Sequence, residues 1–446
     1  MITRIRAENF KSWKDTGELQ LAPLTGLFGT NSSGKTSILQ TLLMLKQTAE
    51  SPDRSRILHT GDDKSLVDLG TFSDLIYNHD HKNDLQLSLS WKLKQPIRHM
   101  TLELPAGNRS VVFAADQISF ETMIYKSQDL IVVDHFIYKF IYNNQTFKFG
   151  MNCKGNNRNL YEFIHTNYEA KWKGDDVNPL PPPVKCYGFP DEAIGYYENT
   201  GFLSGFTLAF ENLFSKIRYL GPIRRQPERI YAWSGEIPLD VGMYGENSIS
   251  ALLASQKLGV PIEERVEEWM QKTELLESFS LKSLSGGNRN LYEIRVMKNY
   301  MSPEVSIRDV GFGVSQILPV LVLCYYVPEG SIILLEQPEI HLHPSVQADL
   351  ADVLIDVVMN RNVQIILESH SEHLLRRLQR RIAEEAIPSD KVNLYFCRME
   401  NGASQIEKLQ LDDEGYISNW PPNFFGDEMA DLVAMTEAAI KRRENE

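Results

Sequence analysis

Residues 29–37 read GTNSSGKTS, which matches the complete phosphate-binding pattern GxxxxGK[ST]. The backbone N–H groups of such a loop cradle phosphate oxygens, and the following helix N-terminus adds the positive end of its dipole. Lys35 can reach the β- and γ-phosphates, and the Thr36 hydroxyl suits a Mg²⁺ ligand. An apolar run at 24–28 precedes the loop and a helix-forming run at 38–45 follows it, as the motif requires. A chance glycine-rich turn before a capped helix is the alternative, but this context favours a nucleoside triphosphate site.

The composition is that of an acidic globular chain. Its 446 residues are 42% hydrophobic and 24% charged, and its formal net charge is −13. That length predicts two or three lobes, and the acidic balance means that any nucleic-acid binding must use a local basic patch. The four cysteines match no metal-binding spacing and fit a reducing compartment. No apolar run is long enough to span a membrane, so we expect a soluble, cytoplasmic protein without a membrane partner.

Four segments of the chain differ in their residue patterns. Residues 1–50 alternate like strands up to the phosphate loop and then become helical, and we expect residues 1–90 to form the N-terminal lobe of a nucleotide-binding head. Residues 91–210 favour strands, as in the aromatic and β-branched run 136–142, and predict a β-rich insertion. Residues 211–300 predict a lobe of helices and loops. Residues 301–446 predict the C-terminal lobe of the head, because their short apolar runs are typical of buried parallel strands.

Two of these apolar runs end in polar residues that suit nucleotide chemistry. The run 331–335 leads into Glu336, and an acidic residue at the end of a buried strand is where a Walker B carboxylate holds Mg²⁺. The run 363–367 leads into Glu368, Ser369 and His370. A histidine at that place can sense a γ-phosphate through a hydrogen bond. The sequence therefore predicts that the second half of the site follows these two strands.

Taken together, the motifs resemble those of a known group of ATPases. The loop with Asn31 is similar to the GxNxxGK[ST] variant of ABC-class heads, which include RecF, SMC and OLD-type ATPases. Four further runs carry the resemblance: NFKSW at 9–13, GFGVSQILP at 311–319, EQPEIHLHP at 336–344 and the closing segment 413–425, which resembles the tail of a bacterial subgroup. The resemblance implies an α/β fold, an ABC/RecF-like P-loop ATPase head with an inserted β-rich and helical region.

By this resemblance, two heads pair around two molecules of ATP, each bound with Mg²⁺. The loop of one copy and a short segment of the other then form each nucleotide site, and the residues implied are Asn31, Ser32, Ser33, Gly34, Lys35, Thr36 and Ser37 with Gly313 and Ser315. The implied metal ligands are Thr36 and Glu336. The implied catalytic residues are Lys35, Glu336, Gln337 and His370.

The serine that crosses to the other head has two candidates. The sequence LSGG at 284–287 resembles the ABC signature more literally, but a serine beside two glycines more often forms a turn. In ABC heads the signature serine lies a short way before the Walker B carboxylate. Ser315 lies close to that spacing before Glu336, whereas Ser285 lies much further away. We therefore favour Ser315.

Gln337 departs from the ABC pattern. The residue after the Mg²⁺ carboxylate is normally a glutamate that orients or activates the attacking water. Glutamine can orient water through hydrogen bonds but cannot take its proton, and in some GTPases a glutamine does orient the water. Glu339 or Glu368 is available to supply the missing carboxylate. We expect slow turnover and a long-lived ATP-bound dimer.

Three other groups of residues have competing interpretations. His341 and His343 form a His-x-His pair, but a shaped loop facing the partner head is favoured over a metal site. Arg224, Arg225 and Arg229 flank two prolines and suit either phosphate contacts or a salt-bridged surface. Arg376, Arg377, Arg380 and Arg381 share one helical face, for which a solvated surface is favoured over a DNA-backbone patch.

The resemblance suggests three functions. The leading one is a dimeric ATPase switch that controls a separate effector, a nuclease or toxin from a neighbouring gene, in bacterial anti-phage defence. We see no catalytic nuclease set, and the chain after His370 is too short for a fused nuclease domain, so the effector is expected to be another protein. The alternative is a RecF/SMC-like DNA-repair ATPase that binds DNA when ATP is bound. An ATPase serving a membrane transporter is the least favoured.

Overall fold

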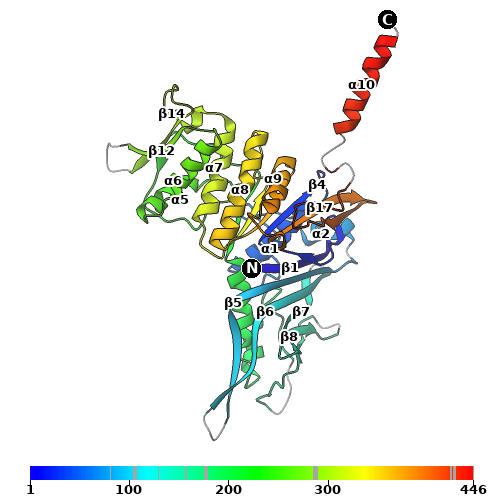
Figure 1. Cartoon of the computed structure of the whole chain (residues 1–446). Helices are drawn as coiled ribbons and strands as arrows, with labels where there is room; N and C mark the ends of the chain where they lie inside the picture. The colour runs from blue at the N-terminus through cyan, green and yellow to red at the C-terminus, as the bar shows by residue number, and fades with distance from the viewer. Residues whose placement is uncertain are drawn as a thin grey trace.

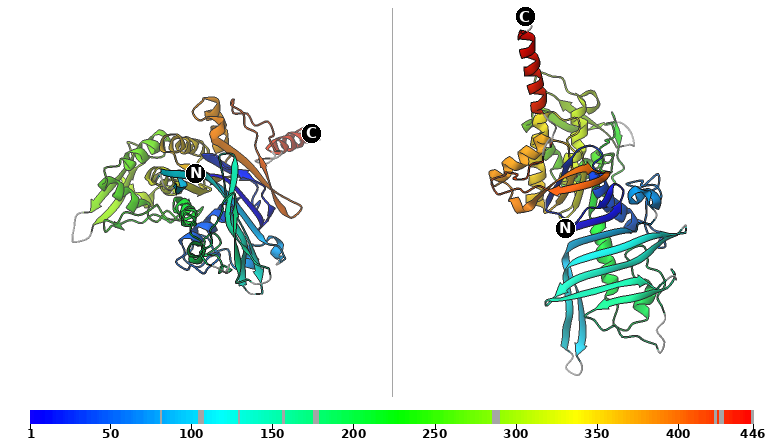
Figure 2. Two further views of the ribbon diagram at one scale, coloured as in Figure 1. Left: turned by 90° about the horizontal axis from the view of Figure 1, so that it is seen from below. Right: turned by 90° about the vertical axis from the view of Figure 1, so that its right-hand side faces the viewer.

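The computed structural model describes residues 1–80, 82–103, 108–128, 130–155, 158–174, 179–284, 290–421, 424 and 428–444. Three sheets organise this part of the chain, and they contain eight, six and four strands. In Figure 1 the largest sheet lies below the central one, and a helical lobe lies to the upper left. Two further views in Figure 2 show that the large sheet extends away from the rest of the molecule.

The central sheet is almost entirely parallel. Its strands, in spatial order, are β10 (Ile217–Leu220), β15 (Ile332–Glu336), β16 (Gln364–Glu368), β4 (Leu24–Gly29), β17 (Val392–Glu400) and β18 (Ala403–Lys408). Only β18 runs antiparallel, to β17. Because the carboxyl ends of parallel strands meet at one edge of a sheet, the residues that follow β4, β15 and β16 converge there.

Alternate residues of the central strands belong to two different hydrophobic cores. Ile332 and Leu334 of β15 pack in the core that includes α1 (Lys35–Glu50). The side chains between and after them, Ile333 and Leu335, pack in the core formed with α7 (Phe312–Tyr326), α8 (Pro344–Arg361) and α9 (Glu372–Ala383). Both faces of the strand are therefore covered, which explains why its sequence is a continuous apolar run.

The large sheet contains the predicted β-rich insertion. Its strands are β2 (Trp13–Asp15), β1 (Ile2–Phe10), β5 (Leu85–Glu103), β6 (Asn108–Ser127), β7 (Leu130–Tyr142), β8 (Gln145–Cys153) and β9 (Tyr161–Thr166), with β3 (Leu19–Gln20) paired to β1. All pairings are antiparallel. Asn143 and Asn144, with φ of 48° and 60°, form the hairpin turn between β7 and β8.

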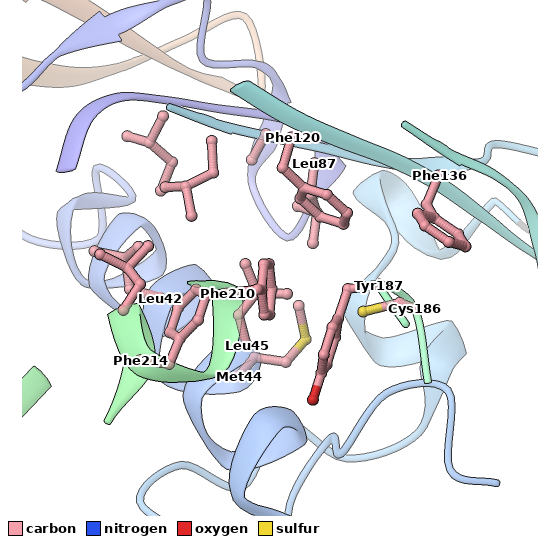
Figure 3. Close-up of a cluster of buried hydrophobic side chains, with 14 of the residues drawn as sticks. Leu42, Met44, Leu45, Leu87, Phe120, Phe136, Cys186, Tyr187, Phe210 and Phe214 are labelled. Atoms are coloured by element: carbon pink, nitrogen blue, oxygen red, sulfur yellow. The ribbon is translucent and has the colours of Figure 1, made fainter. Parts of the chain in front are cut away.

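Two helices connect this sheet to the nucleotide half of the molecule. Figure 3 shows Leu42, Met44 and Leu45 of α1 facing Phe210 and Phe214 of α4 (Leu203–Phe214), with side chains of the sheet above them. The ring centroids of Phe120 on β6 and Phe210 on α4 are 5.0 Å apart. The phosphate-loop helix therefore rests on the insertion rather than on solvent.

A smaller lobe packs against α7. It contains α5 (Ser248–Lys257), α6 (Ile262–Lys272) and a sheet of β11 (Tyr231–Ala232), β12 (Ser278–Leu284), β13 (Leu291–Met297) and β14 (Val305–Ser306). Helix α6 buries Ile262, Val266, Trp269 and Met270, which share one helical face. The short helices elsewhere are α2 (Phe72–Leu75), η1 (Tyr77–His79), α3 (Asp191–Gly195), η2 (Ile307–Asp309) and η3 (Ser389–Lys391).

The α/β fold with an inserted β-rich sheet agrees with the sequence prediction. The expected boundary between residues 90 and 91 lies within β5, and β1 pairs with β5, so the first strand of the chain and the insertion share one sheet. The division into four segments stays a prediction. Helix α10 (Glu428–Glu444) extends away from the body in Figure 1. Within the described residues, no helix has the length and apolarity needed to cross a membrane.

Candidate functional site

The loop between β4 and α1 is held open by its backbone conformation. Ser32 and Gly34 both have positive φ, of 58° and 89°. A Cβ atom added to Gly29 would lie 1.9 Å from the carbonyl oxygen of Cys397, so only glycine fits there. Among the described residues, the amides of residues 31–34 donate no hydrogen bond. Successive free N–H groups in such a turn, followed by a helix N-terminus, make an anion-binding concavity.

Trp13 fixes the end of this loop. Its indole Nε1–H donates to the carbonyl oxygen of Gly34 at 3.0 Å. A Cβ atom on Gly34 would approach this nitrogen to 2.7 Å and the Ser404 hydroxyl to 2.5 Å. The NFKSW strand, which carries part of the resemblance, thus contacts the phosphate loop directly.

Lys35 and Thr36 begin helix α1 and face the end of β16. The Lys35 ammonium donates to the carbonyl oxygens of Thr30 at 2.7 Å and Gly29 at 3.2 Å, and the residue is 3% exposed. The Thr36 hydroxyl donates to Oε2 of Glu368 at 2.6 Å. Oε1 of the same carboxylate lies 3.9 Å from the Lys35 ammonium. Glu368 therefore bridges the two residues that the motif assigns to phosphate and metal.

Glu336 ends the neighbouring strand in register with Glu368. It is 6% exposed, and its Oε1 accepts a hydrogen bond from the Tyr219 hydroxyl of β10 at 2.8 Å. Burial raises the pKa of Glu336 to about 7; the charge of Glu368 adds to this rise, while the Tyr219 hydrogen bond and the Arg224 charge oppose it. Two buried carboxylates side by side repel each other, and a divalent cation between them would relieve that repulsion.

The loop after Glu336 turns sharply and meets the end of β16. Gln337 has φ of 44°, and its N–H donates to the carbonyl oxygen of Glu368 at 2.9 Å. Oε1 of Glu339 accepts hydrogen bonds from the Ser369 hydroxyl at 2.8 Å and the His370 N–H at 2.7 Å. Burial raises the pKa of Glu339, whereas burial and nearby Lys35 lower the pKa of His370. The imidazole is therefore neutral at pH 7 and can exchange a hydrogen bond with a phosphate oxygen.

These residues fit a triphosphate with Mg²⁺. The free amides of the loop and the Lys35 ammonium are donors of the kind that phosphate oxygens accept. The Thr36 hydroxyl and the carboxylates of Glu336 and Glu368 are the hard oxygen ligands that Mg²⁺ prefers. The structure thus brings Lys35, Thr36, Glu336, Gln337 and His370 to the one edge where the sequence predicts them.

Gly313 and Ser315 lie in the first turn of α7, apart from that edge. The Ser315 hydroxyl donates to the carbonyl oxygen of Phe312 at 2.8 Å, and the residue is 8% exposed. In the described part of the chain, neither Gly313 nor Ser315 shares a hydrogen bond or ion pair with residues 29–37. Their role in the nucleotide site stays a prediction that needs a second copy of the chain. The competing candidate, Ser285, lies outside the described residues.

The two histidines of the His-x-His pair have structural partners. His341 packs edge-on against the exposed ring of Phe312, at 5.1 Å between ring centroids. Nδ1 of His343 accepts from the N–H of Ser345 at the start of α8. The described residues contain no group of three histidine, cysteine or acidic side chains suited to a metal ion.

The arginine groups separate clearly. On α9, all four arginines contact carboxylates: Arg376 with Glu372, Arg377 with Asp349 and Asp352, Arg380 with Glu384, and Arg381 with Asp352 and Glu384. Arg229 forms two hydrogen bonds with Asp309, and Arg225 pairs with Glu228. Arg224 differs, because it is buried beside Glu336 and its Nη2 reaches only the carbonyl oxygen of that residue, at 3.4 Å.

Tyr219 is the contact that the motifs miss. It lies in β10, within the segment 211–300 for which the sequence predicts helices and loops, and nothing in the sequence of β10 says which strand lies beside it. Its hydroxyl reaches Glu336, 117 positions away, because β10 and β15 are parallel neighbours. A tyrosine one residue before the end of this short strand is the only signal that the sequence offers.

Comparison with known proteins gives a family match over most of the chain. The model of the family described as AAA ATPase domain matches residues 1–178 and 246–375, and that of a family described as Protein of unknown function (DUF3696) matches residues 387–435. The first match includes the loop, Glu336 and His370, and it confirms the prediction of a P-loop ATPase. A search of curated proteins found no match.

Solved structures of similar overall arrangement have low sequence identity. An Smc head bound to the C-winged helix domain of ScpA is 12% identical, with 92% of this chain and 98% of that chain covered and a TM-score of 0.43. The SMC head domain from Thermotoga maritima is 12% identical, with 92% and 99% covered and a TM-score of 0.37. An Smc head with an extended coiled coil, bound to the C-terminal domain of ScpA and derived from Pyrococcus furiosus, is 10% identical, with 92% and 96% covered and a TM-score of 0.41. With TM-scores below 0.5, these three structures support no inference about this chain.

Proposed function

We propose, from the premise that the chain belongs to the AAA ATPase domain family, that it is an ATP-dependent switch whose heads pair when ATP is bound. The observation that carries the proposal is the contact between Thr36 and Glu368. It joins the loop after β4 to the end of β16, beside Glu336 on β15. A nucleotide bound there would contact the ends of three strands. Its binding and its hydrolysis would therefore change contacts at all three strands.

The residues at this edge of the sheet have different roles in binding and hydrolysing the nucleotide. The loop amides and Lys35 hold the phosphates, and Thr36 and Glu336 hold the metal. Mg²⁺, when bound, neutralises charge on the phosphate oxygens. Gln337 orients the attacking water but cannot accept its proton. Two other carboxylates are available to accept the proton of the attacking water. Glu339 already accepts hydrogen bonds from Ser369 and His370. Glu368 lies beside Lys35 and Thr36.

An exposed apolar side chain at the start of α7 supports pairing of two heads. Phe312, the first residue of that helix, is 51% exposed. A large apolar side chain left in water is often covered in a protein–protein contact. A partner copy that covers Phe312 would bring Gly313 and Ser315 to its phosphate loop. Each nucleotide site would then be shared between two chains.

The finer role is control of a separate effector, a nuclease or toxin, in bacterial anti-phage defence. It is supported only by the resemblance of the motifs at 311–319 and 336–344 to those of OLD-like ATPases. The alternative, a DNA-repair ATPase, has less support, because the four arginines of α9 are engaged by carboxylates. Co-purification with the product of the neighbouring gene, tested with and without ATP, separates the two. An effector that binds only with ATP favours the switch, and ATP-enhanced, salt-dependent DNA binding without an effector favours the alternative.

Light scattering after size exclusion tests the pairing. Wild-type protein is expected to be monomeric without nucleotide and dimeric with ATP and Mg²⁺. Phe312→Arg should bind ATP normally and remain monomeric, because a charge replaces the exposed ring on the shared face. A Phe312→Arg dimer indistinguishable from wild type would remove this face from the proposal.

ATP turnover tests the part played by Gln337. Gln337→Glu restores a proton acceptor at this position, so we expect turnover to rise about 100-fold, the lower end of the range of general-base effects. The ATP-dependent dimer should become shorter-lived in the same variant. Fast wild-type turnover that this substitution does not change would contradict the slow-switch proposal.

A further inference from the structure

Arg224 is a buried cation with unused hydrogen-bond donors. It follows β10 and is 5% exposed. Its Nη2 donates to the carbonyl oxygen of Glu336 at 3.4 Å, while Nε and Nη1 have no partner among the described residues. Burial lowers the pKa of Arg224 to about 10, so the guanidinium is still charged at pH 7. A charged group of this kind is costly to bury without partners.

The neighbouring carboxylate does not explain this arrangement. Oε1 of Glu336 is occupied by the Tyr219 hydroxyl, and the guanidinium reaches the backbone of Glu336 rather than its carboxylate oxygens. Its neighbour Arg225 is accommodated as charged side chains usually are. The Arg225 side chain is 60% exposed and forms an ion pair with Glu228 at 2.7 Å. Arg224 is thus turned inward, toward the site. The charges of Glu336 and Glu339 act on its guanidinium, but within the described residues neither carboxylate forms an ion pair with it.

The backbone around Arg224 is fixed. The N–H of Gly221 donates to the carbonyl oxygen of Met243 at 2.9 Å, and the N–H of Arg225 donates to that of Tyr244 at 2.8 Å. Pro222 lies between these two anchors and restricts the chain further. A guanidinium on such a segment is held in place before a ligand arrives, which lowers the entropy cost of binding.

We propose that Arg224 binds the terminal phosphate of the nucleotide and distinguishes ATP from ADP. This inference rests on the proposed function of the site. Neighbouring strands lie about 4.8 Å apart, and β10 is three strand positions from β4. A triphosphate bound at the loop after β4 and running past Glu336 points toward Arg224. Its terminal phosphate is then the group that approaches the guanidinium. The guanidinium fork then gives its free donors to a phosphate oxygen.

Calorimetric titration of ATP and ADP, both with Mg²⁺, tests the proposal. The quantity to compare is the ratio of the two dissociation constants within each variant, because partial loss of active protein cancels in it. Arg224→Gln is expected to lower the preference for ATP over ADP by about tenfold or more, the loss expected for a charge-assisted hydrogen bond. ADP affinity should change little. Arg224→Lys should recover part of the preference, and the matched control Arg225→Gln should behave as wild type.

Different failures have different meanings. Wild-type protein that binds neither nucleotide would overturn the proposed function itself. An unchanged ratio in Arg224→Gln, or an equal loss of both affinities, would overturn only the role of Arg224.

If Arg224→Gln does not fold, hydrogen exchange on protein that keeps Arg224 decides the question. Protection of residues 221–226 by the non-hydrolysable analogue AMP-PNP, but not by ADP, is expected. The measurement is made on Phe312→Arg, in which protection by dimerisation is not expected. Equal protection by both nucleotides would contradict the inference.

Discussion

Two groups of buried or half-buried arginines in this molecule have opposite surroundings. On α9, Arg377 and Arg381 share Asp352 of α8, with three nitrogen–oxygen distances of 2.7 to 2.8 Å. At the edge of the central sheet, Arg224 is more deeply buried, and yet two of its donors have no partner among the described residues. The same type of side chain is paired with carboxylates in one place and has no hydrogen bond to a carboxylate in the other.

This difference in pairing distinguishes arginines with a structural role from an arginine at a binding site. Paired charges between α8 and α9 hold two helices together, and nothing further needs to bind there. Around Glu336 the charges are incompletely matched: Oε2 of Glu339 is also buried and has no partner in the described part of the chain, and two carboxylates end adjacent strands. Such a cluster costs stability unless a ligand completes it, which is typical of a binding site.

Removing Lys35 should give the largest effect. Lys35→Ala takes away the cation that the motif directs to the phosphates, so ATP affinity is expected to fall about 100-fold or more. Titration calorimetry measures the loss, with Lys92→Ala, an exposed lysine on β5, as control. Near-normal ATP binding would mean that the loop is not the nucleotide site.

Glu368→Gln tests whether the carboxylate beside Thr36 belongs to the metal site. Glutamine keeps an acceptor for the Thr36 hydroxyl but removes the negative charge. The Mg²⁺ concentration needed for half-maximal ATP binding should rise about tenfold, in the range seen when supporting ligands of a metal are lost. Glu372→Gln, which breaks an exposed ion pair on α9, is the control. An unchanged Mg²⁺ requirement would leave Glu368 a structural residue.

Asp352→Asn tests the paired side of the comparison. It leaves two guanidinium groups without their shared carboxylate, and the free energy of unfolding should fall by about 1–3 kcal/mol. Nucleotide affinity should stay within about twofold of wild type, since α9 is not expected to contact the ligand. Urea denaturation at pH 7 measures the first quantity and calorimetry the second. A large loss of ATP affinity would show that the two regions are coupled.

The same substitution has a defined pH dependence. Burial opposes ionisation of Asp352, but its hydrogen bonds and the charges of Arg381 and Arg377 hold its pKa below the ordinary value of 3.8. A lowered pKa in the folded state means that the stabilisation is complete above the ordinary value and is lost as the pH falls through the folded one. The difference between wild type and Asp352→Asn should therefore be constant from pH 8 to pH 5.

Tyr219→Phe should give the smallest effect. It removes one hydrogen bond to Oε1 of Glu336 and leaves the aromatic ring in place. Loss of one such bond is expected to weaken Mg²⁺-dependent ATP binding about fivefold, with little change in fold stability. Tyr395→Phe, whose hydroxyl bonds only to the carbonyl oxygen of Gln20, is the matched control. Equal effects of the two substitutions would argue against a special role for Tyr219.

Local sequence was enough to find the core of the candidate site. The loop at 29–37 and the residues that follow two apolar runs, Glu336 and His370, are recognisable because each depends on a few consecutive residues and their strand context. The arginines could not be sorted in this way. Whether Arg224 faces a phosphate or a surface depends on where the chain after β10 lies, and whether Arg377 is solvated depends on Asp352 across a helix–helix contact.

The sequence by itself determined that a phosphate loop lies between a strand and a helix, because glycines with positive φ and consecutive apolar residues act locally. It also determined that β15 and β16 are buried on both faces. Only the tertiary structure decided that β16 lies between β15 and β4, and so that Glu368 meets Thr36, 332 positions away. Apolar strands bury similar side chains, so their sequences do not specify the order of the strands in the sheet. The packing of the whole molecule sets that order. The order in turn decides which charged residues lie together at one edge of the sheet.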